Sequence, residues 1–225
     1  MHIEILTEDS STTELLKILV PKLIGTYGEP HTWRLHAYKG MGRLPKDLQR
    51  HGDPAKRVLL DQLPRLLGGL GATTSGVDLI VVVLDSDNRD CKAFLSELKG
   101  VASACKVESK TMFRLAIEET EAWYLGDWPA LLAAYPKAKA KILREYEQDS
   151  VCGTWELLAN AVVDGGLEVV RRRGGPLPGD LKHEWARNVG PRMSVEENAS
   201  PSFLKFCAGL RRSVLSVEAS SATDK

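Results

Sequence analysis

The stretch "LIVVVLDSDNRDC", Leu79–Cys91, decides the fold class. Its first six residues are Leu, Ile or Val, and they lead directly to Asp85, Asp87 and Asp90. An uninterrupted apolar run that ends in polar turn residues indicates a strand buried on both faces, as in a parallel sheet covered by helices. Ligands of open α/β sheets bind at the carboxyl edge of the strands. The stretch therefore predicts such a sheet, with acidic side chains at its ligand-binding edge.

The flanking sequence alternates between strand-like and helix-like segments. Strands are predicted at residues 2–6, 31–38, 79–84 and from 113 onward. Helices are predicted between them at 10–25, 53–70 and 88–105, where apolar residues recur at helical spacing behind Ser, Thr or Asp caps. The segment "FRLAIEETEAWYLGD" changes from strand to helical spacing near Glu118. This order predicts an α/β fold with a mainly parallel sheet and helices on both faces.

Residues beyond 127 favour helices separated by Gly and Pro, at 129–147, 154–173, 180–193 and 200–217. We therefore expect an α/β core at 1–127, a helical C-terminal extension at 128–217 and a disordered tail at 218–225. In "NASPSF" we expect Asn198 or Ser200 to cap a helix, with Phe203 and Phe206 buried.

The composition narrows the functional classes. The 225 residues include 30 Lys and Arg against 30 Asp and Glu, so any nucleic-acid binding depends on local patches. The four cysteines lie far apart, which argues against a zinc site and a disulfide framework. The chain has no signal-like start and no apolar run of about 20 residues. We expect a cytoplasmic protein without membrane contact.

Three groups of carboxylates fall at the carboxyl ends of predicted strands. The groups are Glu8; Asp85 and Asp87; and Glu118, Glu119 and Glu121. Magnesium and manganese prefer oxygen ligands, and two such ions can clamp the attacking and leaving oxygens of a phosphoryl transfer. At the end of a strand Asp85 and Asp87 point to the same side, so both can reach one metal. The pattern predicts a metal site at the sheet edge.

Each acidic group also has a purely structural interpretation. Asp87 or Asn88 can cap the following helix, and carboxylates in a first helical turn complement the helix dipole. Glu118 and Glu121 are three residues apart, so a helix places them on one face, where either can complete the metal site or act as a base. We favour Glu121 as a site residue, with Glu118 as second choice. Trp123 and the neighbouring Tyr124 are expected to pack under the helical extension.

The segments "ILTED" and "VVVLDSDNRD" together resemble the Toprim domain of topoisomerases, bacterial primases, recombination proteins and overcoming-lysogenization-defect nucleases. That family carries a glutamate after its first strand and a DxD after its third, which coordinate magnesium for phosphodiester chemistry. Glu8 matches the glutamate, and Asp85 and Asp87 match the DxD. One departure is that Asp9 follows Glu8, where the family has glycine.

Two further segments, "AIEETEAWYLGD" and "NASPSFLKF", are similar to a Toprim-related bacterial family that is often encoded next to an ATPase. This resemblance implies a separately encoded ATPase partner and a role in defence against phage. It fits the absence of a GxxxxGK(S/T) nucleotide-binding loop from this chain.

The stretch from Arg34 to Arg57 holds seven basic residues, including Arg50, and only two acids. Lys39 and Arg43 flank Gly40 and Gly42, which allow the backbone to approach a phosphate. We expect Lys39, Arg43 and Lys46 to bind substrate; a solvated loop is the alternative interpretation.

The leading hypothesis is a magnesium-dependent nuclease or phosphodiester-transfer enzyme acting on DNA or RNA, the effector of an ATPase-coupled anti-phage system. Its catalytic residues are Glu8, Asp85, Asp87 and Glu121, and its metal ligands are Glu8, Asp85, Asp87 and Glu118. The alternative is a catalytically silent Toprim-like binding module that works through a partner ATPase. A haloacid-dehalogenase phosphatase would need DxD(T/V), but Asn88 occupies the last position. Homo-oligomerisation is left open.

Overall fold

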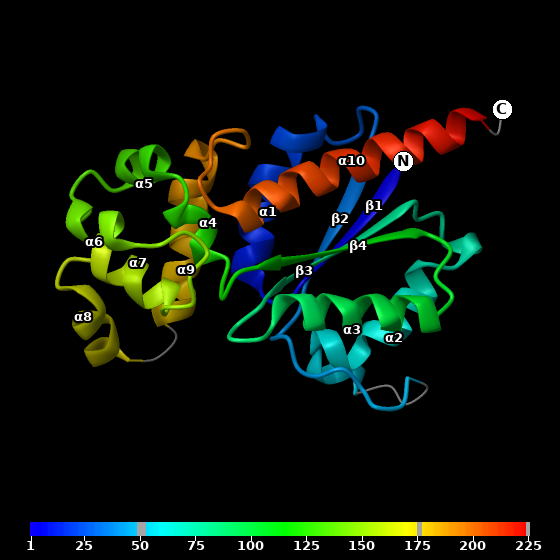
Figure 1. Ribbon diagram of the computed structural model, residues 1–225, viewed down its shortest axis with the longest axis horizontal. Coiled ribbons are helices and arrows are strands. Elements are labelled where there is room, and N and C mark those ends of the chain that lie inside the picture. The colour runs from blue at the N-terminus through cyan, green and yellow to red at the C-terminus, as the bar shows by residue number, and fades with distance from the viewer. Residues whose placement is uncertain (49–52, 175–176, 224–225) are drawn as a thin grey trace.

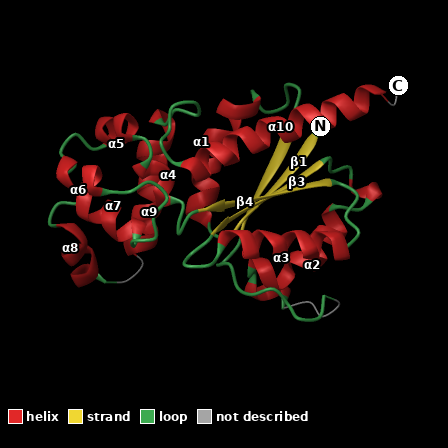
Figure 2. Ribbon diagram, in the orientation of Figure 1, coloured by secondary structure: helices red, strands yellow, loops and turns green. Residues whose placement is uncertain are grey.

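The computed structural model describes residues 1–48, 53–174 and 177–223. Four parallel strands form one sheet in the order β2-β1-β3-β4 (Figure 2). The strands are β1 (His2–Thr7), β2 (Thr32–Ala37), β3 (Leu79–Asp85) and β4 (Lys110–Ala116). This arrangement confirms the α/β fold class and the parallel sheet.

Helices cover both faces of the sheet, as predicted (Figure 1). One face carries α1 (Ser10–Ile24) and α10 (Pro201–Thr223), and the other carries α2 (Leu59–Leu70) and α3 (Cys91–Ala104). Alternate strand residues enter the two cores: Ile5 and Val81 pack toward α1, whereas Leu6 and Val82 pack toward α2 and α3. All of β3 is buried, which explains its unbroken apolar sequence.

The strand register brings the carboxyl ends to one edge. Thr7 of β1 lies opposite Val83 of β3, and Asp85 lies opposite Ala116 of β4. The residues after β1 and at the end of β3 therefore lie side by side. This edge is where the acidic groups were predicted to meet.

A helical lobe continues from that edge (Figure 1). It contains α4 (Glu121–Leu125), α5 (Trp128–Ala134), α6 (Ala140–Glu145), α7 (Thr154–Val162), α8 (Gly166–Arg173) and α9 (Leu177–Val189). Short 3-10 helices lie at Pro54–Lys56, Thr73–Ser75 and Gly190–Arg192.

The segments 129–147 and 154–173, each predicted as one helix, are each two helices. Pro136 lies in the first break, and Gly165 has a φ of 81° at the second, a backbone conformation that does not continue a helix.

The last helix, α10, leaves the lobe and returns to the sheet, where it packs on β4 beside α1 (Figure 1). The predicted extension at 128–217 therefore splits between a lobe and a sheet-covering helix. The physical reason is that α1 packs on β1 and β2, whereas β4 is covered by α10, whose buried Leu210 and Val214 enter the core on that face. Residues 218–223 continue α10, although we predicted a disordered tail there, and 224–225 lie outside the described residues.

Trp123 of α4 connects the lobe with α10. Its ring centroid lies 5.4 Å from that of Phe203 and 5.2 Å from that of Phe206, and its Nε1 donates to Ser202 Oγ at 3.0 Å. Ser200 Oγ accepts from the backbone N–H of Phe203 at 3.3 Å, which confirms Ser200 as a cap. The burial of Phe203, Phe206, Trp123 and Tyr124 is also confirmed.

Candidate metal centre

Three carboxylates meet at the carboxyl edge of the sheet. Oxygens of Glu8, Asp9 and Asp85 all lie within 4.8 Å of one another. Glu8 follows β1, Asp85 ends β3, and the backbone N–H of Asp85 donates to Glu8 Oε2 at 3.4 Å. The Asp85 residue is only 5% exposed. This group, which we call the acidic cluster, is able to hold a metal ion.

Asp9 belongs to the cluster, although in the sequence it was only a departure from a family pattern and not a predicted ligand. It caps α1, because its Oδ1 accepts from the backbone N–H of Thr12 at 2.7 Å and from Ser11 Oγ at 2.7 Å. The positive end of the α1 dipole favours a carboxylate at this position. The run "DSSTT" predicts a helix cap, but nothing in it predicts a metal ligand.

Two threonine hydroxyls orient the cluster. Thr12 Oγ1 donates to Asp9 Oδ2 at 3.0 Å, and Thr120 Oγ1 donates to Asp85 Oδ1 at 3.0 Å. The two hydroxyl oxygens lie 3.0 Å apart. Since Thr12 comes from α1 and Thr120 directly precedes α4, the aspartates are held by two separate elements. Neither threonine was predicted as a site residue.

Burial and crowding disfavour the charged carboxylates. Burial raises the pKa of Asp85 well above its ordinary value, and Glu8 and Asp9 raise it further. The pKa of Glu8 rises to about 8, chiefly through burial and then through the neighbouring charges of Asp9 and Asp87. A bound cation neutralises exactly this kind of repulsion between acids, so the electrostatics agree with a metal-holding role.

The raised pKa of Glu8 predicts a pH-dependent stability. Between the ordinary pKa of 4.5 and about 8, the folded state holds a proton that the unfolded chain has released, so the free energy of unfolding falls as pH rises. Glu8→Gln is expected to flatten this decline and to stabilise the fold by about 2 kcal/mol at pH 8 without metal. Urea unfolding in chelator at pH 5 and pH 8 measures the effect, with the exposed Glu168→Gln as control. An unchanged pH slope in Glu8→Gln contradicts the assignment.

A second charged group lies beside the acidic cluster. Lys182 of α9 places its Nζ 3.0 Å from Glu119 Oε1 and 3.2 Å from Glu121 Oε2. Burial raises the pKa of Glu121 to about 7, although Lys182 opposes the shift. Burial alone would lower the pKa of Lys182, but Glu121, Glu119 and then Asp85 raise it, and the net shift is upward. Glu121 is thus close enough to raise the pKa of Asp85 and is paired with a lysine, while its role as a site residue stays a prediction.

Lys182 was missed by the sequence analysis. It lies 61 positions beyond Glu121, in a helix whose place depends on how the lobe packs against α1. Its segment, "DLKHEW", gives no motif. Only the tertiary structure identifies it as part of this edge.

Asp87 lies beside the acidic cluster and is not part of it. Strand β3 ends at Asp85, and Asp87 has a φ of 48°, so strand alternation does not extend to it. Its side chain is 54% exposed and 3.8 Å from Arg89. The prediction that the two aspartates project together is therefore wrong in this structure, although Asp87 is close enough to raise the pKa of Glu8.

Glu118 serves a different purpose from the predicted one. Its φ is 58°, and α4 begins only at Glu121, so the two glutamates do not share a helical face. Its carboxylate accepts from three consecutive backbone N–H groups at the start of α7: Cys152 at 3.1 Å, Gly153 at 2.8 Å and Thr154 at 2.9 Å. Glu118 therefore anchors α7 to the sheet edge.

Glu118→Gln tests this anchoring role. An amide accepts these N–H groups less strongly than a carboxylate and has only one acceptor oxygen, so we expect a loss of about 1–3 kcal/mol in the free energy of unfolding. The affinity for Mn²⁺, measured by calorimetry, is expected to stay unchanged. Glu168→Gln on α8 again provides an exposed control. A large loss of Mn²⁺ affinity in Glu118→Gln would mean that Glu118 is a metal ligand.

The basic loop is attached to this edge through its backbone. Gly40 donates to the carbonyl of Glu8 at 2.7 Å with a φ of 101°, a conformation that favours glycine. Lys39, Arg43 and Lys46 are all exposed on this loop. The Gly40 hydrogen bond brings this residue and the adjacent Lys39 to the segment that carries Glu8, whereas the backbone N–H of Arg43 donates to Asp61 Oδ1 of α2 at 2.9 Å. Arg50 lies outside the described residues.

Comparison of the chain with family models, with curated proteins and with solved structures gave no match. None of the described helices combines the length and apolarity required to cross a bilayer.

Proposed function

We propose that this chain is a Toprim-like, Mg²⁺- or Mn²⁺-dependent nuclease that cleaves phosphodiester bonds in nucleic acid. The observation that carries the proposal is the acidic cluster: three carboxylates from the ends of two adjacent parallel strands, with oxygens within 4.8 Å. The ligand-binding edge of an α/β sheet is the place where such a centre is expected.

The donor set suits a hard divalent cation. The ligands would be Glu8, Asp9 and Asp85, which offer only oxygen, the ligand type that Mg²⁺ and Mn²⁺ prefer. When bound, the ion would supply positive charge for the phosphate oxygens of the substrate. Asp9 replaces Asp87 as the third ligand in this proposal, because Asp87 lies outside the cluster.

The neighbouring residues support phosphodiester chemistry. Glu121, with a pKa of about 7, is able to hold or release a proton near neutral pH. The ammonium of Lys182 keeps Glu121 in place. Lys39, Arg43 and Lys46 would hold the phosphate backbone of the substrate beside the cluster, as basic side chains do without reading sequence.

The biological setting follows from the resemblance. We propose that a separately encoded ATPase controls the nuclease and that the pair acts in the cytoplasm against phage. The support is the similarity of the "EETEAW" and "NASPSF" segments to the ATPase-linked family, together with the absence of a GxxxxGK(S/T) loop from the sequence.

A cleavage assay tests the proposal. Plasmid, linear single-stranded DNA and transfer RNA are incubated separately with the protein in Mg²⁺, Mn²⁺ or chelator. We expect at least one substrate to be cut with metal and none with chelator.

The second candidate, a silent binding module, is favoured by the exposure of Asp87 and the capping role of Glu118. Mn²⁺ binding without cleavage of any substrate, even with the ATPase present, would support that candidate and contradict the nuclease.

A further inference from the structure

Strand β4 has one open edge. It is the last strand in the order β2-β1-β3-β4. The carbonyl of Ala116 accepts from the backbone N–H of Ser86 and so faces β3. In a parallel strand, successive residues turn their backbone groups to opposite sides, so those of Phe113 and Leu115 face outward. In agreement, the Phe113 carbonyl accepts from Arg114 Nη1 at 2.7 Å and not from a strand.

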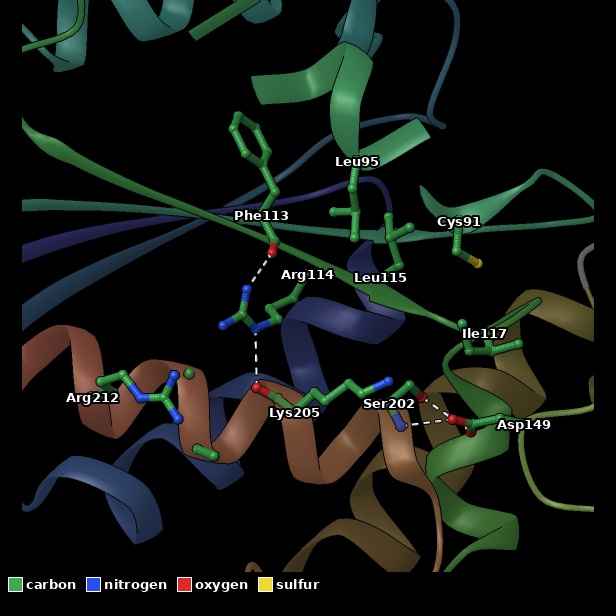
Figure 3. A pocket seen from close by; sticks show the side chains of 12 residues that line it. Cys91, Leu95, Phe113, Arg114, Leu115, Ile117, Asp149, Ser202, Lys205 and Arg212 are labelled. Atoms are coloured by element: carbon green, nitrogen blue, oxygen red, sulfur yellow. Dashed lines mark hydrogen bonds between the residues drawn. The ribbon is translucent and has the colours of Figure 1, made fainter. Parts of the chain in front are cut away.

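A groove of about 360 Å³ runs along this edge between α3 and α10. Its two sides differ in chemistry (Figure 3). Leu95 and Leu115 lie on the α3 side, whereas Arg114, Lys205 and Arg212 lie on the α10 side. A second groove of about 510 Å³ adjoins it and adds Lys99 and Lys110.

The cations of the α10 side pair with no carboxylate in the part of the chain that the structure describes. Among the described residues, no ion pair joins Arg114, Lys205 or Arg212 to an acid. Of the described residues that line the groove, only Asp149 carries a carboxylate, and it accepts from Ser200 Oγ at 2.7 Å and from the backbone N–H of Ser202 at 2.6 Å. The groove is therefore positively charged along one side.

Contacts with α10 fix the position of the Arg114 side chain. Its Nε donates to the Lys205 carbonyl at 3.0 Å, and a Cβ on Gly209 would lie 2.0 Å from its Nη2. Glycine at position 209 thus leaves the space that the guanidinium occupies. Burial lowers the pKa of Arg114, and the nearby Arg212 lowers it further, so an anion in the groove would relieve an existing repulsion.

We propose that the open edge of β4 binds an extended, acidic segment of a partner protein by β-strand addition. The bound segment alternates acidic and apolar residues. Its backbone pairs with Phe113 and Leu115, its acids face Arg114 and Arg212, and its apolar side chains face Leu95. The bond from Arg114 to the Phe113 carbonyl is replaced by one from the incoming backbone, and the guanidinium turns to a carboxylate. This inference does not depend on the nuclease assignment.

Two other occupants fit less well. A second copy of the chain, paired edge to edge, would bring Arg114 and Arg212 against the same cations. Nucleic acid would match the cations, but it would not pair with the outward backbone groups of Phe113 and Leu115 as a strand does, and it would leave the apolar side of the groove without apolar contacts.

A labelled seven-residue peptide that alternates Glu and Val tests the proposal by fluorescence anisotropy with the full chain. We expect saturable binding that Arg212→Glu weakens about tenfold or more, equivalent to about 1.4 kcal/mol. Arg172→Glu, an exposed cation on α8, is the matched control and is expected to bind as wild type does. Gly209→Ala, which displaces Arg114, is expected to weaken binding as well.

Three comparisons can overturn the proposal. A peptide of the same composition in two blocks, Glu then Val, must bind at least about tenfold more weakly if alternation matters. A peptide N-methylated at alternate residues must lose binding if backbone pairing matters. Equal binding of either peptide, or no binding of the alternating peptide, would refute strand addition. If an oligothymidylate binds the groove more tightly than the peptide and in an Arg212-dependent way, the site is a nucleic-acid surface instead.

Discussion

Asp85→Asn is expected to abolish the proposed metal-dependent cleavage, with a loss of about 10³-fold or more, and to remove measurable Mn²⁺ binding. Asp85 is the most buried member of the acidic cluster and contributes a full negative charge once a cation is bound. An amide cannot replace that charge, and electrostatic stabilisation of several kcal/mol corresponds to this range of rates. The fold is expected to persist, because Asn has nearly the same shape and its Oδ1 still accepts from Thr120.

Calorimetric titration with Mn²⁺ and a cleavage assay measure the effect on binding and rate separately. Asp90→Asn is the matched control, since Asp90 caps α3 through the backbone N–H of Ala93 at 2.7 Å and lies outside the cluster. Asp87→Asn tests whether the metal ligands are the acidic cluster or the pair of aspartates in the DxD motif. We expect this variant to retain Mn²⁺ binding. If Asp87→Asn loses as much affinity as Asp85→Asn, the cluster as described here is not the set of ligands.

Trp123→Ala is expected to lower the free energy of unfolding by about 4 kcal/mol. The side chain is fully buried, stacks on Phe206 and leaves a large cavity when truncated. The change also removes the donor to Ser202 Oγ. Because these contacts join α4 to α10, the substitution weakens both the lobe and the packing of α10 on the sheet.

Urea unfolding followed by circular dichroism measures this loss. Leu215→Ala, at a residue of α10 that is 66% exposed, is the control and should change stability by less than about 0.5 kcal/mol. A loss below about 1 kcal/mol for Trp123→Ala would mean that α10 does not dock on α4 as described.

The sheet and two members of the acidic cluster could be predicted from local sequence. The run from Leu79 to Leu84 is short and rich in β-branched residues, which favours a strand with both faces covered, and parallel strands bring their carboxyl ends together. Glu8 and Asp85 follow from that rule. Asp9 could be predicted only as a helix cap, because nothing in its neighbours indicates that its carboxylate lies beside those of Glu8 and Asp85.

The remaining site residues depend on tertiary structure. Asp87 and Glu118 both have positive φ values and are joined by an antiparallel bridge. Asp adopts a positive φ more readily than most residues, but Glu does not, and neither preference predicts the bridge. Lys182 reaches Glu121 only because the lobe packs on α1. Strand alternation therefore failed for Asp87, which follows the end of β3. Helical spacing failed for Glu118, which precedes the start of α4.

The late position of α10 affects how the chain is synthesised. A ribosome that has made residues 1–200 has produced every strand of the sheet, but not the helix that covers Met112 and stacks on Trp123. That apolar surface stays exposed to chaperones and proteases until the last helix emerges. A message truncated before α10 therefore yields a product that carries the acidic cluster but lacks a complete core, and cellular quality control should remove it before it can act.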